Sequence, residues 1–353
     1  MEKIVAGEIE RYEKERIKTF LEKGLNDIGL TFHNKRVLIK PNLLSGHPPE
    51  KAITTHPLVV CAIAEILKDN SCEVFIGDSP GYESTEKVLK KAGFLEIIQS
   101  LNIKISRFDK KIVKRRDGIS PYKEFTFGED PSSFDLIFNV PKLKTHVMMG
   151  LTLGVKNTFG FIHAFDKARW HLKAGKDREL FAKVLIDIHN IVAPHITVLD
   201  GIIGMDGDGP SNGRVRTFGI LCISKNAFAL DHFIEKMINV PFLLPVTKVA
   251  ERFSLVNEYE TVIYGYPKIE DFILPNTINT DWNLPSSIKT LLRNLFIKKP
   301  KLKKDKCKKC GICKNVCPAS AIYLSEEHIE FDYKKCIRCY CCQEMCPNNA
   351  IKI

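Results

Sequence analysis

Short apolar runs alternate with amphipathic segments over the first 297 residues, and each pattern predicts its own kind of element. Consecutive apolar residues bounded by Gly, Pro or charged residues predict buried strands, whereas apolar residues at helical spacing predict helices. The expected strands are residues 36–40, 73–77, 134–140, 196–199 and 218–223, and the expected helices are 8–28, 57–68, 83–93, 180–192 and 229–237. Strands that alternate with helices are typical of a mainly parallel sheet with helices on both faces. The pattern therefore predicts an α/β fold.

Polar side chains directly follow four of the expected strands. They are Lys40, Asn42, Asp78, Ser79, Lys142, Lys144, His146, Asp200, Asp206 and Asp208. Ligands of open α/β sheets bind outside the carboxyl ends of the strands. Because four strand ends each deliver polar groups, we expect one shared cleft in which these side chains converge.

The charges of these side chains indicate what such a cleft would bind. The lysines and the histidine would form a cationic wall suited to a phosphate or a carboxylate. Lys144 and His146 are two residues apart, so they would face the same side of an extended segment. Asp78, Asp200 and Asp206 would hold a hydroxyl, an amine or a divalent cation. The alternative is a set of buried ion pairs between the two signs, with no ligand.

The C-terminal residues carry the pattern Cys-x2-Cys-x2-Cys-x3-Cys-Pro twice. The copies are Cys307, Cys310, Cys313, Cys317 and Cys336, Cys339, Cys342, Cys346, offset by 29 residues. The spacing is typical of two 4Fe–4S clusters, because a cubane needs four thiolates and one short loop supplies three. Two matched runs fit a disulfide framework badly, and zinc sites favour paired Cys-x2-Cys units. Cys341 lies off the pattern and is interpreted as a bystander thiol, and Cys61, Cys72 and Cys222 as core thiols.

Residues 306–353 resemble the bacterial two-cluster ferredoxin. In that family the fourth Cys of each run ligates the other cluster. The resemblance implies two 4Fe–4S clusters with crossed ligand sets. The first set is Cys307, Cys310, Cys313 and Cys346, and the second set is Cys336, Cys339, Cys342 and Cys317.

A second resemblance covers about residues 35–235. The segments 40–43, 77–81, 141–146, 151–157, 200–201 and 207–210 are similar, in this order, to those of the family called domain of unknown function 362. Members often carry a ferredoxin-like module, and the family name records no settled activity. One departure is Lys225-Asn226, which stands where the family usually has an Asp. With Lys156 and Asn157 from the fourth segment, the candidate cleft comprises Lys40, Asn42, Asp78, Lys142, Lys144, His146, Lys156, Asn157, Asp200 and Asp206.

The net charge of +11 is unevenly distributed. Residues 298–353 hold 13 Lys and Arg against 6 Asp and Glu, and the lysines just before the first cysteine predict a basic linker. We therefore expect an α/β domain over 1–284, a linker over 285–305 and a ferredoxin-like α+β domain over 306–353. The basic run is interpreted first as a solvated tether. The alternatives are that it offsets the negative charge of the clusters, or that it docks a redox partner protein with an acidic face. A nucleic-acid site is not favoured, because aromatic residues are not interleaved with the lysines.

These features favour an iron–sulfur electron-transfer protein of the cytoplasm. No run of about 18 apolar residues predicts a membrane span, and the charged N-terminus is unlike a signal peptide. The chain lacks the Gly-x-Gly-x-x-Gly of a Rossmann site and the phosphate-loop motif of ATP hydrolysis. The alternative function is a ferredoxin-fused reductase, an oxidoreductase acting on an anionic small molecule or a flavin in the cleft. His163 and His171 are assigned no role.

Overall fold

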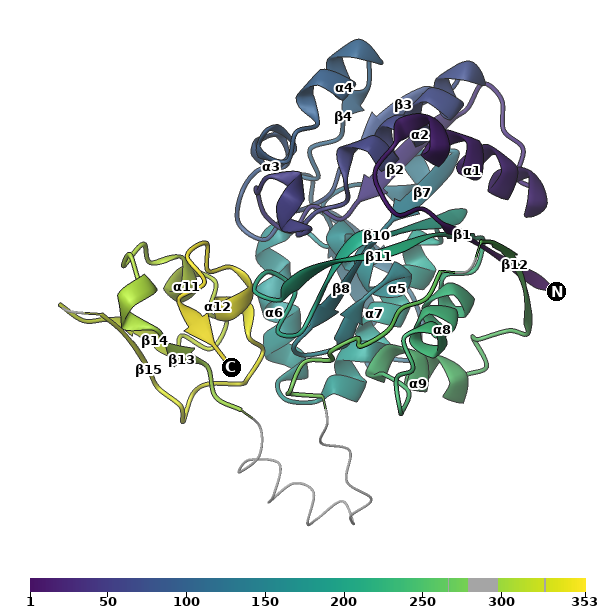
Figure 1. The fold of residues 1–353 in the computed structure, drawn as a ribbon. Coiled ribbons are helices and arrows are strands. Elements are labelled where there is room, and N and C mark those ends of the chain that lie inside the picture. The colour runs from purple at the N-terminus through teal and green to yellow at the C-terminus, as the bar shows by residue number, and fades with distance from the viewer. Residues whose placement is uncertain (266, 279–297, 327) are drawn as a thin grey trace.

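The computed structural model describes residues 1–265, 267–278, 298–326 and 328–353. In this part of the chain a large unit is built on one sheet, and a small C-terminal unit packs against its side (Figure 1). Residues 285–297 of the expected linker lie outside the described residues.

The large unit contains a sheet of ten strands. Eight of them follow the order β12-β1-β11-β10-β7-β2-β3-β4, while β8 pairs with β10 and β9 pairs with β8. The strands are β1 (Glu2–Glu8), β2 (Arg36–Pro41), β3 (Glu73–Ile76), β4 (Lys104–Ile105), β7 (Leu136–Val140), β8 (Lys142–His146), β9 (Gly150–Thr152), β10 (Ile196–Asp206), β11 (Arg214–Ser224) and β12 (Tyr259–Tyr264). A separate hairpin joins β5 (Ile112–Arg115) and β6 (Glu124–Phe127).

Neighbouring strands from β10 through β7, β2 and β3 to β4 are parallel, and β11 is antiparallel to both β10 and β1. Helices cover both faces of this sheet (Figure 1). On β2 the side chains alternate, so that Val37 and Ile39 join one core cluster while Leu38 joins another. The predicted α/β fold with a mainly parallel sheet is confirmed.

The large unit contains the helices α1 (Lys14–Asp27), α2 (Pro57–Asp69), α3 (Thr85–Lys91), α4 (Leu95–Ser100), α5 (Gly154–Asn157), α6 (Ala164–Ala174), α7 (Arg178–Val192), α8 (Ala227–Met237) and α9 (Pro245–Arg252). Four of them, α2, α3, α7 and α8, begin after a residue whose side chain caps them. Asn226 caps α8, because its side-chain oxygen accepts hydrogen bonds from the amides of Phe228 and Ala229. The Lys225-Asn226 departure thus has a structural role.

Two local expectations differ from the structure. The helix expected from residue 8 begins at Lys14, and residue 8 is instead the last residue of β1. Ile4 and Val5 are fully buried there because β1 pairs with both β11 and β12, which a local pattern does not reveal. Residues 142–146 were expected as a segment after a strand, and they form β8.

The small unit repeats one motif at the 29-residue offset. It contains β13 (Lys301–Leu302), α11 (Ile312–Asn315), β14 (Ile322–Leu324), β15 (Ile329–Phe331), α12 (Cys341–Glu344) and β16 (Ile351–Lys352). β13 pairs with β16 and β14 with β15. This unit therefore starts within the segment expected as a linker. Cysteines and isoleucines share its core.

None of the helices in the described ranges is both long and apolar enough to cross a membrane.

Candidate functional site

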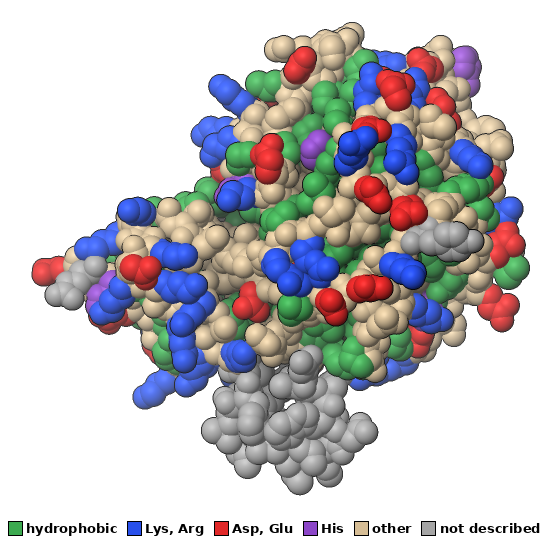
Figure 2. Space-filling model, in the orientation of Figure 1, with side chains coloured by type: hydrophobic (Ala, Val, Ile, Leu, Met, Phe, Trp, Pro, Cys, Tyr) green, Lys and Arg blue, Asp and Glu red, His purple; other side chains and the backbone are tan. Residues whose placement is uncertain are grey.

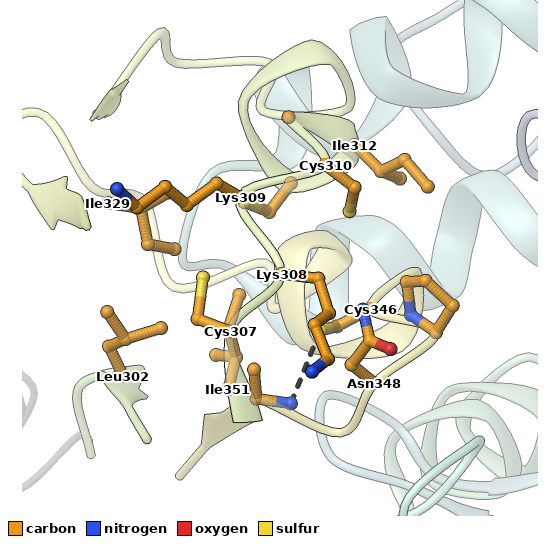
Figure 3. Close-up of a pocket in the computed structure, with 14 residues that line it drawn as sticks. Leu302, Cys307, Lys308, Lys309, Cys310, Ile312, Ile329, Cys346, Asn348 and Ile351 are labelled. Carbon is orange, nitrogen blue, oxygen red and sulfur yellow. Dashed lines mark hydrogen bonds between the residues drawn. The ribbon is translucent and has the colours of Figure 1, made fainter. Parts of the chain in front are cut away.

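The first run of cysteines lines a cavity in the small unit. Figure 3 shows Cys307 and Cys310 on the loop before α11, with Cys346 approaching from the other repeat. Cys313, at the second position of α11, completes the cysteines of the lining. Cys346 thus meets the run to which it does not belong in sequence. We call this cavity the first cysteine cavity.

A second cysteine cavity is lined by the reciprocal set. Cys336, Cys339 and Cys342 come from the second run, and Cys317 comes from the first. Tyr340 also lines this cavity. Tyr340 is 2% exposed and belongs to the core cluster of the large unit that contains Trp170 and Phe181. The second cavity therefore borders the core of the α/β unit.

The geometry and donor set suit a cubane better than a single ion. In the described part of the chain, no three His, Cys, Asp or Glu side chains gather closely enough to hold one metal ion. The thiols instead stand around a hollow, with apolar side chains such as Ile329 and Ile351 beside them. Backbone amides of Ala321 and Ala350 donate to the sulfurs of Cys317 and Cys346, both at 3.3 Å. Such bonds stabilise thiolates and tune cluster potentials.

The two cavities differ in their access to solvent. Cys310 is exposed in the first cavity, whereas Cys339 and Cys342 in the second are both at least nine-tenths buried. Solvent exposure changes the potential of an iron–sulfur cluster and its access to partners.

The second repeat attaches the small unit to the α/β unit through α12. The side chain of Gln343, 1% exposed, donates to the carbonyl of Asp208 at 2.9 Å. In return, Asn212 donates to the Gln343 carbonyl at 3.2 Å and Ser211 to the Glu344 carbonyl at 2.8 Å. α12 therefore docks on the loop between β10 and β11, beside the carboxyl ends of the strands.

Two expected cleft residues form a buried ion pair at the ends of β2 and β3. Lys40 Nζ lies 2.9 Å from Asp78 Oδ1, and both side chains are almost fully buried. The backbone amide of Leu43 donates to the other carboxylate oxygen at 2.8 Å. A Cβ at residue 160 would collide with both charged groups, so Gly160 allows the backbone to pack directly against this ion pair.

A second ion pair forms a larger network at the start of β8. Lys142 Nζ lies 2.9 Å from Asp200 Oδ2 and donates to the hydroxyl of Tyr12 at 2.6 Å. Tyr12 in turn donates to Asp200 Oδ1 at 2.8 Å and stacks on the ring of His56. Burial and the nearby Asp200 raise the pKa of Tyr12, so its hydroxyl stays protonated. The sequence missed Tyr12 because it follows no expected strand.

Asp206, the last residue of β10, forms ion pairs with two arginines of β11. Arg214 binds both of its oxygens, at 2.9 and 2.8 Å, and Arg216 lies at 3.2 Å. The three carboxylates expected to face a ligand are thus each bound to a Lys or an Arg. These three aspartates therefore form the ion pairs that were the alternative to a role in binding a ligand.

Asn42 and Asn157 connect the strand ends to α5. Asn42 Nδ2 donates to Asn157 Oδ1 at 3.1 Å, and Asn157 Nδ2 donates to the Asn139 side chain at 2.8 Å. The carboxylate of Asp231 fixes the start of α5, because it accepts from the amides of Gly154 and Val155 at 2.7 and 3.0 Å. Lys156 is thereby held at the same edge of the sheet.

Lys144 and His146 lie together on β8, as predicted from their spacing, and both are 1% exposed. Lys144 Nζ donates to the carbonyl of Ile53 at 2.6 Å. Burial lowers the pKa of Lys144 to about 7 and that of His146 well below its usual value. The charge of Lys156 lowers the pKa of His146 further.

Three neighbouring residues had no signal in the sequence pattern. Lys167 and His171 come from α6, and Glu344 comes from α12 of the small unit. Burial lowers the pKa of Lys167 to about 8 and that of His171 to about 3. Glu344 Oε2 lies 3.7 Å from His146 Nε2. Helix α6 and the small unit thus contribute side chains near Lys144 and His146. The search for polar residues after expected strands could not find them, because neither α6 nor α12 directly follows one of those strands.

Comparisons with known proteins agree with this division of the chain. The family model described as Domain of unknown function (DUF362) matches residues 37–235, and that of a 4Fe-4S dicluster domain matches 299–347. The thylakoid-associated protein sll1697 of Synechocystis sp. is 32% identical over 270 residues, covering 74% of this chain and 84% of that protein. The lactate racemase apoprotein from Thermoanaerobacterium thermosaccharolyticum aligns with a TM-score of 0.42 and 12% identity, covering 66% of this chain and 57% of that one. Both resemblances inferred from the sequence are confirmed.

Proposed function

The chain belongs to the domain of unknown function 362 family, and because it also carries a 4Fe–4S dicluster domain, we propose that it passes single electrons through two 4Fe–4S clusters. The observation that carries the proposal is the crossed arrangement of the cysteines. Cys346 lines the cavity of the first run and Cys317 that of the second. Each cavity then has the four thiols that one cubane needs. The proposed ligand sets are those inferred from the ferredoxin resemblance.

The positions of the cavities support an order for electron flow. The first cavity reaches solvent at Cys310, whereas the second is lined by Tyr340, whose side chain packs into the core of the α/β unit. A partner protein can approach only the exposed side closely. Electrons would therefore exchange with the partner at the first cluster and with the α/β unit at the second.

The charge of the small unit supports an acidic partner. Lys308 and Lys309 line the first cavity and are exposed, and Figure 2 shows further Lys and Arg side chains over the same unit. Basic side chains around a redox centre attract an acidic surface and raise the rate of encounter. The cytoplasm stays the predicted compartment.

The second candidate function is a reductase that acts on a small anion or a flavin bound by the α/β unit. It is favoured by the docking of α12 at the carboxyl ends of the strands, where ligands of α/β sheets bind. A carrier alone would not require α12, which carries Cys342 of the second cavity, to place Glu344 3.7 Å from the buried His146 of the α/β unit.

The crossed arrangement is tested by Cys346→Ser, because this residue belongs to the second run but lines the first cavity. We expect Cys346→Ser and Cys310→Ser to lose or alter the same cluster, and Cys339→Ser to affect the other. Anaerobic purification, iron and sulfide analysis, and electron paramagnetic resonance of the reduced protein would distinguish the two signals. Cys341→Ser is the matched control and should keep both clusters. If Cys346→Ser instead matches Cys339→Ser, the crossed arrangement is wrong.

A further inference from the structure

Five basic side chains from three elements of the α/β unit converge beside α12. We call Lys144 and His146 of β8, Lys156 of α5, and Lys167 and His171 of α6 the basic cluster. Their charges act on one another: Lys156 lowers the pKa of His146, His171 and Lys144. Three of the five side chains are more than nine-tenths buried, and Lys156 and Lys167 are half-buried. Burial lowers the pKa of both histidines, so the positive charge of the cluster at the junction of the two units is that of its three lysines.

The basic cluster differs from the neighbouring ion pairs because its lysines have no carboxylate partner. Lys40 and Lys142 each lie 2.9 Å from an aspartate. Lys144 donates to the carbonyl of Ile53, and Lys167 donates to the carbonyl of Ser79. In the parts of the chain that are described, no ion pair within 4 Å neutralises the amines of Lys144, Lys156 or Lys167. Burying such charges without a counter-charge is costly.

The ring of His146 supplies independent evidence for an acceptor at this place. Its Nδ1 accepts hydrogen bonds from the amides of Met148 and Met149, at 3.1 and 3.3 Å. The proton of the neutral ring must therefore be on Nε2, which becomes a donor. This Nε2 is buried and has no hydrogen-bond partner. A buried donor without a partner costs about 1–3 kcal/mol, which a ligand oxygen would recover.

One carboxylate already stands close to this donor. Glu344 Oε2 is 3.7 Å from His146 Nε2, which is too long for a hydrogen bond. The charge of Glu344 also raises the pKa of Lys144, Lys156 and Lys167, so it acts electrostatically on all three amines. Asp78 acts on two of these lysines, but it is already paired with Lys40. One glutamate cannot neutralise three lysines, so additional negative charge would be stabilised here.

We propose that the basic cluster binds a small molecule bearing carboxylate or phosphate groups, and that the Glu344 carboxylate competes with this molecule for the same donors. A ligand with at least two negative charges would neutralise the lysines and accept from His146 Nε2. Glu344 belongs to α12, which also carries Cys342 of the second cysteine cavity. The bound molecule would lie beside the second cluster. The inference deepens the reductase function proposed above and rests on it only for the fate of the electrons.

Anion binding by the anaerobically purified full-length protein would test this inference. Isothermal titration calorimetry would use inorganic phosphate and, separately, succinate as probes. We expect saturable binding of at least one probe, weakened about tenfold or more by Lys156→Ala or Lys167→Ala, since each removes a charge-assisted contact. Glu344→Gln should tighten binding several-fold, because it removes the competing charge. Lys90→Ala, an exposed lysine on α3, is the matched control and should leave the affinity unchanged.

The outcomes separate this inference from the electron-transfer function. No saturable binding of either probe, or equal affinity in all variants, would overturn the anion site. A gain of affinity in Glu344→Gln cannot result from a loss of folding, so the proposal stays testable even if a lysine variant is unstable. Reduction and reoxidation of the clusters would be followed in the same samples. Clusters that cycle without anion binding overturn only the site, whereas binding without cycling clusters overturns only the electron transfer.

Discussion

The buried lysines at the strand ends are of two kinds, which differ in the partner of the amine. Lys40 and Lys142 are buried and paired with aspartates, so their charges are compensated inside the fold. Lys144 is buried equally deeply, but its amine reaches a backbone carbonyl instead of a carboxylate. A charge that is compensated holds the structure together, whereas a charge that is not compensated is available to a ligand.

The depressed pKa of Lys144 predicts a pH-dependent stability. Its pKa is about 7 in the folded protein against 10.5 when unfolded, so the unfolded state binds more protons between these values. The penalty for burying Lys144 is therefore complete below pH 7 and decreases as pH rises. We expect the melting temperature of Lys144→Met, relative to the natural protein, to be highest near pH 7 and to fall towards pH 9. A difference that is constant with pH would contradict this prediction; differential scanning calorimetry would measure it.

At the residue scale, the sequence predicted which side chains share a side of a strand better than it predicted their hydrogen-bond partners. The i, i+2 spacing correctly placed Lys144 and His146 on one side of an extended segment. The spacing gave no reason to pair Lys142 with Tyr12, which is 130 residues away. Such long-range pairs depend on which strands become neighbours, and that information is not local.

The short helix α5 is an element that does not stabilise itself. Its four residues are too few for an isolated helix, so its position depends on tertiary contacts. Asp231 of α8 binds the first two amides of α5, and Asn157 at its end is held by Asn139. Burial raises the pKa of Asp231 to about 8 in spite of these hydrogen bonds.

Removing this cap should destabilise the protein and weaken the anion site together. In Asp231→Ala the amides of Gly154 and Val155 would lose their acceptors, which costs about 1–3 kcal/mol. We also expect weaker binding of phosphate or succinate, because Lys156 is carried by α5. Asp231→Asn, which retains one acceptor oxygen, should have a smaller effect on both. Thermal denaturation and calorimetric titration would measure the two effects, and a normal affinity in a destabilised Asp231→Ala would show that α5 does not position the site.

Elements with a strong internal pattern were predictable, and those formed by pairing were not. The expected strand at 73–77 and helix at 57–68 agree with β3 and α2 to within a residue or so at each end. β1 was missed because its charged first residues resemble the start of the following amphipathic helix. Only its position between β11 and β12 makes it a strand.

At the scale of the whole molecule, the two repeats of the small unit have different surroundings. α11 carries Cys313 next to the solvent-accessible first cavity, whereas α12 is fixed to the α/β unit by hydrogen bonds to three loop residues, Asp208, Ser211 and Asn212. The duplicated cysteine pattern made both cavities predictable. Which repeat would dock could not be predicted, because the two patterns are almost equivalent in sequence.

Charge around the first cavity should control the rate of electron exchange with anionic reagents. We expect Lys308→Gln combined with Lys309→Gln to slow reoxidation of the reduced protein by one equivalent of ferricyanide, by roughly twofold to fivefold at low salt. The difference should vanish at high ionic strength. Lys87→Gln combined with Lys90→Gln, exposed on α3, is the matched control. Equal rates for all variants in stopped-flow measurements would place the exchange site elsewhere.

The crossing of Cys346 into the first cavity also links oxygen damage to assembly. Because Cys310 is exposed, a cluster bound in the first cavity would be the one that oxygen attacks first. Its loss would release Cys346, which follows α12 by two residues. The chain that leaves the docking helix would then be free to move. Exposure to air would therefore weaken the contact between the two units before a cluster in the buried second cavity is degraded. Electron transfer to the α/β unit would then stop early in oxidative stress.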